Sequence, residues 1–223
     1  MRRLIPNIFK PRDIFRKKSL TTMSYPESFI AEQYRTIRTN IQFINGVKKN
    51  QSFLITSTNS EEGKSTTAVN LAVSLVQQKE RVLLIDTNLK KPSVHMTFNL
   101  DNSIGLTDIL RGKQSFDDAV VKTEFGRLEV LPSGPIPFNS SELIGSRTMF
   151  DLIESTLKRY DIVIFDSPSI LESSDTKILA NLCDGVILVI KSGKTETKKA
   201  IEAKRLLDIA KAKIIGVILN NSK

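Results

Sequence analysis

The sequence contains no tryptophan, only one cysteine and only one histidine. The lone cysteine, Cys183, excludes an internal disulfide framework and fits a reducing compartment; we interpret it as a small buried residue. No apolar run approaches the roughly 18 residues that a membrane-crossing helix needs. Pro6, Lys10, Pro11 and Arg12 interrupt the N-terminal apolar residues, so we expect no signal-peptide core there.

Positive charge is concentrated at the N-terminus. The chain has 223 residues and a net charge of +9, and residues 1–20 alone contribute +6 of that charge. We therefore expect a basic N-terminal arm at residues 1–23 and a single folded domain at residues 24–223. Basic residues near an anionic leaflet contribute about 1 kcal/mol each, so residues 1–20 predict contact with an anionic membrane surface; a solvated tail is the alternative. The domain has no basic helix and no aromatic-rich sheet, so we expect no nucleic-acid partner.

Apolar runs alternate with helical patterns along the domain. The predicted strands are residues 53–57, 82–86, 128–131, 162–166, 186–190 and 214–219, and the predicted helices are residues 26–45, 64–78, 106–110, 116–122, 148–159, 176–182 and 196–210. Continuous Val/Ile/Leu strands between helices predict an α/β fold, a doubly wound and mostly parallel sheet with helices on both faces. In such sheets ligands bind beyond the carboxyl ends of the strands.

The first strand is followed by a loop and then by Gly-Lys-Ser-Thr, which opens a helix. This context is typical of a phosphate-binding loop, although Thr58 stands where the usual motif begins with glycine. Backbone N–H groups at a helix N-terminus face an anion, Lys64 can reach the β- and γ-phosphates, and the Ser65 hydroxyl can hold Mg²⁺. We therefore predict ATP and Mg²⁺ as cofactors, with a nucleotide-binding loop made of Thr58, Asn59, Ser60, Glu61, Glu62, Gly63, Lys64, Ser65 and Thr66.

Two other predicted strands end in an aspartate, Asp86 in one and Asp166 in the other. A carboxylate at the end of a buried strand is costly unless it serves a metal, a proton or a hydrogen bond. Because the strand ends meet at one edge of the sheet, we expect both aspartates to lie beside the phosphate-binding loop. One can hold Mg²⁺ and one can orient a nucleophile, and the predicted metal ligands are Ser65, Asp86 and Asp166.

Together these motifs resemble the bacterial tyrosine kinases of capsule and exopolysaccharide synthesis. The resemblance runs from Glu32 to Asn220, and its most specific pieces are Glu32-Gln-Tyr-Arg-Thr-Ile-Arg38, Asp86–Pro92 with His95, and Ser133–Pro137 with Ser141-Glu-Leu143. It implies an ATP-dependent protein-tyrosine kinase, an autokinase whose substrates are protein tyrosines.

The resemblance also implies a role for individual residues. Lys64 and Ser65 would bind the phosphates and Mg²⁺, and Asp166 would support Mg²⁺. Asp86 would orient or deprotonate the attacking tyrosine, and Asn220 would contact adenine. We give the single histidine, His95, a structural role, because Asp86 already supplies the base.

The resemblance implies partners as well. Glu32, Arg35 and Arg38 share one face of a predicted helix. They would form a subunit contact that builds a homo-oligomeric ring, in which a neighbour's tyrosines reach the active site; an intrahelical ion pair is the alternative. A transmembrane polysaccharide co-polymerase adaptor would hold the kinase at the cytoplasmic, inner face of the plasma membrane.

The chain departs from the family pattern at three places. Ser60-Glu61 replaces Pro-Gly in the loop, and Asn88 replaces an aspartate. A side chain in a left-handed conformation at Glu61 would cost about 1–2 kcal/mol. The sequence up to Lys223 has three tyrosines, with no tyrosine cluster at its end.

These departures keep two alternatives open. One is an attenuated regulatory subunit that binds nucleotide with little phosphoryl transfer. The other is a partition- or division-type ATPase, which the sequence disfavours because those relatives carry a second lysine near Asn59.

Overall fold

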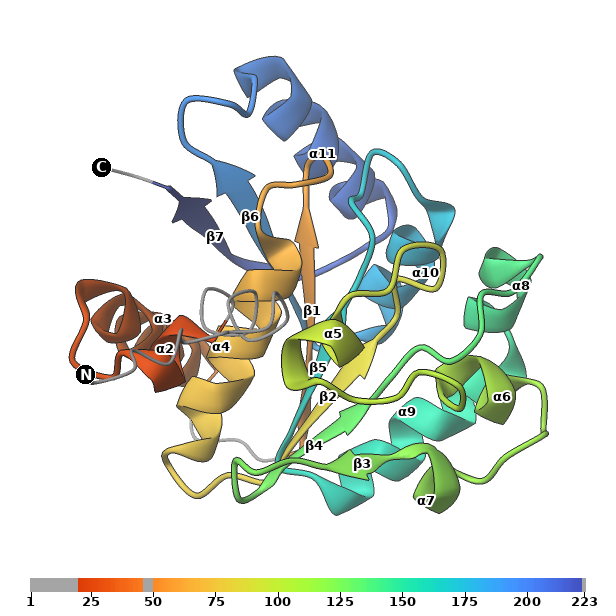
Figure 1. The fold of residues 1–223 in the computed structure, drawn as a ribbon. Coiled ribbons are helices and arrows are strands. Elements are labelled where there is room, and N and C mark those ends of the chain that lie inside the picture. Colours follow the sequence, from red (N-terminus) through yellow and green to blue (C-terminus); the bar gives the residue numbers. More distant parts are fainter. Residues whose placement is uncertain (1–19, 46–49, 222–223) are drawn as a thin grey trace, which may run out of the picture.

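A mostly parallel sheet forms the centre of the molecule. The computed structural model describes residues 20–45 and 50–221. Within them lies a seven-stranded sheet with the order β3-β4-β2-β5-β1-β6-β7 (Figure 1). Neighbouring strands are parallel except for the antiparallel pair β3–β4. The predicted α/β fold with a mostly parallel sheet is therefore confirmed.

The strands are β1 Gln51–Ser57, β2 Val82–Asp86, β3 Val121–Lys122, β4 Leu128–Leu131, β5 Ile162–Asp166, β6 Gly185–Lys191 and β7 Ile214–Asn220. The helices are α2 Thr21–Ser24, α3 Phe29–Asn45, α4 Lys64–Val76, α5 Val94–Phe98, α6 Leu106–Leu110, α7 Phe116–Ala119, α8 Ser140–Ile144, α9 Arg147–Arg159, α10 Ser174–Leu182 and α11 Thr197–Ile209. The described residues contain no helix with the length and apolar character that a bilayer crossing requires.

Each face of the sheet carries its own hydrophobic core. Successive strand residues point to opposite faces, so Leu54 joins the core under α9, α10 and α11, whereas Phe53 joins the core under α3 and α4. Figure 1 shows α4 beside β1, between this strand and the helices α2 and α3. Burying both faces explains why the strands read as continuous apolar runs rather than as alternating ones.

Two segments differ from the prediction. The helix expected over residues 116–122 ends at Ala119, because Val121 and Lys122 pair with β4 as a short antiparallel strand. The predicted basic arm includes Leu20 and the first three residues of α2, but Leu20 is buried and the Thr22 N–H donates to the Asn70 side chain on α4 at 2.9 Å. The rest of the arm, residues 1–19, lies outside the described residues.

Candidate functional site

The loop between β1 and α4 is built around a close approach of backbone and side chain. Gly63 has a left-handed φ of 95°. A Cβ atom at this position would lie 2.2 Å from Asn220 Nδ2, so a side chain would strain the backbone and push the Asn220 amide aside. The Asn220 amide donates to the Glu62 carbonyl at 2.9 Å. The end of β7 thus braces the loop, and the contact between Asn220 and adenine stays a prediction.

Glu61, which replaces the family's glycine, adopts a left-handed backbone with φ 60°. Unlike Glu61, whose side chain is exposed, Glu62 is buried. The Glu62 carboxylate accepts hydrogen bonds from the Asn59 N–H at 3.0 Å and from the Thr195 hydroxyl at 2.6 Å. Glu62 therefore ties the loop to the segment between β6 and α11, which is a scaffolding role that the sequence did not predict.

The two aspartates lie side by side at the carboxyl edge of the sheet. Asp86 and Asp166 are register partners on β2 and β5, and both are fully buried. The oxygens of Asp86 accept three backbone hydrogen bonds, from Asn88 at 3.1 Å, Ser93 at 2.9 Å and Val94 at 3.0 Å. These bonds fold the segment after β2 around its carboxylate. The predicted convergence of three strand ends is thus present in the structure.

Burial changes the acidity of both carboxyl groups. Loss of solvent raises the pKa of Asp86, and the three backbone donors and Lys64 offset only part of this effect. Burial and the adjacent Asp86 charge raise the pKa of Asp166, while Ser65 and Lys64 lower it. Two like charges on neighbouring strands disfavour double ionisation, so a bound cation or a shared proton would stabilise the pair.

The residues around Asp166 fit a hard divalent cation. Neither carboxylate oxygen of Asp166 has a hydrogen-bond partner among the described residues, although both are buried. Ser65 lines the same cavity as Lys64. Mg²⁺ binds through one or two protein oxygens together with substrate phosphates. Ser65 and Asp166 would hold it here, with Asp86 alongside.

A cavity of about 290 Å³ lies over these strand ends. It is lined by Ser60, Glu61, Lys64, Ser65, Asn88, Lys90, Lys91, Ser93, Pro168, Ser169, Glu172 and Ser173. Four predicted loop residues are in this set. Of the others, Asn59 and Glu62 bond within the loop, Thr58 is buried at its start and Thr66 is exposed on the first turn of α4.

One acidic residue of the cavity, Glu172, was not predicted from the sequence. Glu172 Oε1 accepts a hydrogen bond from the Ser60 N–H at 3.0 Å. The adjacent Ser169 side chain and the hydrogen bond from Ser60 lower the pKa of Glu172, with a smaller contribution from Lys64. The Glu172 carboxylate thus binds the Ser60 N–H, which is one of the loop N–H groups that an anion could otherwise bind. No motif marks Glu172, because its place depends on the path of the chain after β5.

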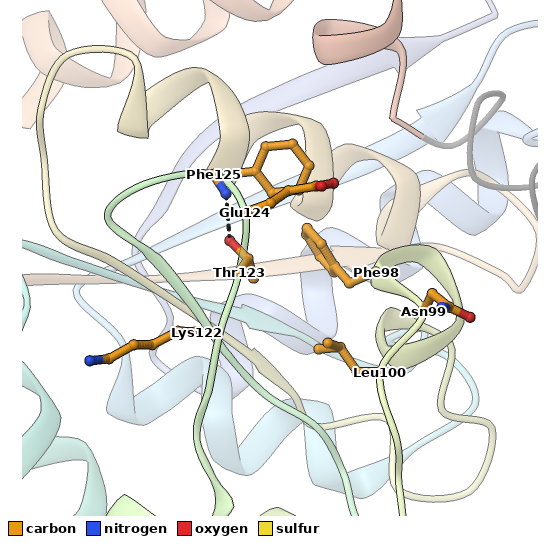
Figure 2. Close-up of a pocket in the computed structure, with 7 residues that line it drawn as sticks. All are labelled: Phe98, Asn99, Leu100, Lys122, Thr123, Glu124 and Phe125. Atoms are coloured by element: carbon orange, nitrogen blue, oxygen red, sulfur yellow. Dashed lines mark hydrogen bonds between the residues drawn. The ribbon is translucent and has the colours of Figure 1, made fainter.

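A second hollow, of about 210 Å³, lies between the end of α5 and the turn that joins β3 to β4. Figure 2 shows its seven lining residues, and among them the Phe98 and Phe125 rings pack edge to face with centroids 5.7 Å apart. None of the predicted site residues lies there. We interpret it as an indentation beside a core contact.

The predicted assembly motif makes contacts within the chain. Arg35 forms an ion pair with Glu32 at 2.5 Å and donates to the Pro26 carbonyl. Arg38 donates to the Ser74 carbonyl on α4 at 2.5 Å. The intrahelical ion pair that was the alternative is therefore present for Arg35, whereas Arg38 holds α3 to α4. The subunit contact stays a prediction.

Comparisons with known proteins agree with this geometry. The AAA domain family matches residues 54–203. The tyrosine-protein kinase YwqD of Bacillus subtilis is 48% identical over 93% of this chain and 87% of its own length. The putative tyrosine-protein kinase CapB of Staphylococcus aureus is 36% identical over 92% of both chains.

A solved structure supports the same relationship. The crystal structure of the chimerical protein CapA2B2 superposes with a TM-score of 0.88 at 37% identity, covering 92% of this chain and 90% of that one. Sequence and fold thus agree over nearly the whole length. The chain belongs to the family of bacterial tyrosine-protein kinases of capsule and exopolysaccharide synthesis, built on a P-loop AAA domain.

Proposed function

We propose that this chain is an ATP-dependent protein-tyrosine kinase that acts in capsule or exopolysaccharide synthesis. The observation that carries the proposal is the pair of buried carboxylates, Asp86 and Asp166, at the strand ends beside Lys64 and Ser65. Catalysis of phosphoryl transfer consists mostly of positioning and charge stabilisation. These four side chains can provide both positioning and charge stabilisation. Membership of the tyrosine-kinase family favours a kinase over a partition-type ATPase.

Each residue has a defined task in the proposed transfer. The loop N–H groups and the Lys64 ammonium hold the phosphates and stabilise negative charge on the transferring group. Asp86 accepts the proton of the attacking tyrosine hydroxyl, and its raised pKa makes it a stronger base than an exposed aspartate. When bound, Mg²⁺ supplies additional charge neutralisation on the phosphate oxygens. Asn220 would contact the adenine from the end of β7.

An attenuated regulatory subunit is the second candidate. Glu61 places a side chain at a left-handed position where it lines the cavity, and Asn88 presents an amide where the family has a carboxylate. Both features bear on rate or affinity, and the left-handed backbone at Glu61 also costs folding stability. Replacing Asn88 with aspartate distinguishes the two candidates. A large gain in the rate of phosphoryl transfer supports an attenuated subunit. An unchanged rate shows that Asn88 does not limit the transfer.

The proposed kinase works in an assembly. Glu32, Arg35 and Arg38 would contact a neighbouring copy in a ring, and a transmembrane polysaccharide co-polymerase adaptor would hold the ring at the cytoplasmic face of the plasma membrane. Residues 1–20 would add contact with anionic lipid through their basic side chains. These partners follow from the family and from the charge of the chain.

Phosphoryl transfer is the test of this function. The full chain is mixed with γ-labelled MgATP and a glutamate–tyrosine copolymer, with and without the adaptor's cytoplasmic tail. Lys64→Met and Asp86→Ala serve as controls. Label on tyrosine that is lost in both variants supports the kinase. Bound ATP without any transfer under either condition overturns it and leaves the regulatory subunit.

A further inference from the structure

The three tyrosines of the sequence differ sharply in exposure. Tyr34 is 9% exposed and Tyr160 is 5% exposed, whereas Tyr25 is 57% exposed. Phosphorylation requires the hydroxyl oxygen to meet a γ-phosphate inside an active site. Among these three side chains, only that of Tyr25 projects into solvent far enough to do so while the domain stays folded.

The other two hydroxyls are also engaged by neighbours. The Tyr160 hydroxyl donates to Glu129 Oε2, and burial together with this carboxylate raises the pKa of Tyr160. Burial raises the pKa of Tyr34 as well, and its hydroxyl bonds to Thr67 on α4. Both tyrosines are core residues with a structural role, and their deprotonation during transfer would be more costly than that of an exposed tyrosine.

Tyr25 stands at the junction that precedes the motif helix. It follows α2 with φ −141° and ψ 69°, and Pro26 keeps this junction out of a helix. The next residue's carbonyl accepts a hydrogen bond from Arg35. The proposed function places α3 at a contact between copies, so Tyr25 would lie at the edge of that contact.

A chain cannot phosphorylate its own Tyr25. Pro26 shares a hollow with Val76 and Gln77, at the end of α4 that is remote from the phosphate-binding loop. The 13 residues of α4 separate this hollow from Lys64 by about 18 Å along the helix axis. Figure 1 shows α2 and α3 packed along the side of α4. The phosphate must therefore come from the active site of another copy.

We propose that Tyr25 is an acceptor tyrosine of this kinase, phosphorylated by a second copy of the chain. This inference rests on the proposed function. The Tyr25 hydroxyl oxygen forms a bond to the γ-phosphorus of ATP, and the bond from that phosphorus to the β–γ bridging oxygen breaks. ADP leaves with the bonding electron pair, and the hydroxyl proton passes to Asp86 of the copy that holds the nucleotide.

The experiment separates donor from acceptor. Full-length Tyr25→Phe, with an intact site, is the donor and full-length Lys64→Met, which cannot catalyse, is the acceptor. They are incubated with γ-labelled MgATP, and the labelled peptides are mapped by mass spectrometry. We expect the label on Tyr25 of the acceptor. Adding Tyr25→Phe to the acceptor should reduce its labelling at least tenfold.

The glutamate–tyrosine copolymer, added to parallel reactions, reports the donor's activity independently. In one outcome the copolymer is labelled, while the acceptor is labelled on Tyr34 or Tyr160 or not at all. This outcome overturns the acceptor role of Tyr25 and leaves the proposed kinase activity in place. Equal labelling of the acceptors with and without Tyr25 has the same meaning. No label on either the copolymer or the acceptor overturns the proposed function, and the acceptor role with it.

Discussion

A single side chain in the phosphate-binding loop, Glu61, combines backbone strain with a charge near the expected phosphates. Its left-handed backbone, φ 60°, costs about 1–2 kcal/mol. Glycine removes this strain but loses about 0.5–1 kcal/mol through unfolded-state entropy. We expect Glu61→Gly to raise the free energy of unfolding by about 0.5–1 kcal/mol. Because a carboxylate near the phosphates also disappears, MgATP should bind roughly threefold tighter or better.

Lys79 provides the matched control for this variant. It is exposed, has φ 67° and lies after α4, away from the cavity. Lys79→Gly should give a similar gain in the free energy of unfolding, measured by urea denaturation. Its affinity for MgATP, measured by calorimetry, should not change. An unchanged affinity in Glu61→Gly would show that the Glu61 carboxylate turns away from the nucleotide.

Asp166 connects stability to pH. A carboxyl group whose pKa is raised on folding binds more protons in the folded than in the unfolded state, so stability falls as pH rises above the ordinary carboxyl range. Asp166→Asn removes this loss. In EDTA and without nucleotide, we expect the variant to be more stable than the parent at pH 8, by on the order of 2 kcal/mol, with the gain shrinking toward pH 4.

Urea unfolding at a series of pH values measures this effect. Asp151→Asn, a change at an exposed aspartate of α9, should alter stability little and without the same trend. A destabilised Asp166→Asn protein at pH 8 would contradict the buried, unfavourable charge assigned to Asp166. The same variant should lose phosphoryl transfer. The Asp166 carboxylate thus lowers the stability of the ligand-free protein, yet catalysis requires it.

At the level of helices, the two arginines of the motif have different energetic roles. Arg38 donates to the Ser74 carbonyl across the α3–α4 contact and is partly buried, whereas the Arg35–Glu32 pair is more exposed. Removing a charged donor to a buried carbonyl costs about 1–3 kcal/mol, and an exposed pair is worth about 0–1 kcal/mol. We expect Arg38→Ala to lower the free energy of unfolding by about 1–2 kcal/mol, and Arg35→Ala by less than about 1 kcal/mol.

Denaturant unfolding at low protein concentration tests this difference without a contribution from assembly. Equal losses in the two variants would contradict it. This difference matters for testing the subunit contact. If Arg38→Ala failed to form a ring, the cause could be either weaker folding or a lost contact between subunits. Arg35→Ala is therefore the cleaner variant for sedimentation experiments on oligomeric state.

The elements themselves were largely predictable, for a physical reason. Strands buried on both faces are mostly apolar, and β2, β4 and β5 have the predicted bounds, although β4 contains Glu129 and β2 and β5 each end in an aspartate. Prediction failed at residues 116–122, where pairing with β4 overrode a local helical pattern. It also failed at α2, whose four residues pack on α4 through the Thr22–Asn70 contact, a pairing that local sequence does not encode.

For the molecule as a whole, parallel topology explains why so much of the candidate site could be anticipated. Gly63, Lys64 and the two aspartates follow from strand–loop–helix order alone. The scaffolding role of Glu62 and the place of Glu172 in the site could not be predicted, because Glu62 bonds to Thr195 and Glu172 to the Ser60 N–H, each across more than one hundred residues of sequence. Such contacts depend on the folded path of loops rather than on any local pattern.

The same topology links nucleotide binding to global stability. The cavity joins segments that follow β1, β2 and β5, and Glu62 and Asn220 connect its loop to β6–α11 and β7. A ligand that binds only the folded state at one hundred times its Kd adds about 2.7 kcal/mol, which for a domain of this size raises Tm by about 5–10 °C. We expect this shift with MgADP in differential scanning calorimetry. Lys64→Met should reduce it below about 2 °C, since phosphate binding loses its ammonium; an undiminished shift in that variant would place the nucleotide elsewhere.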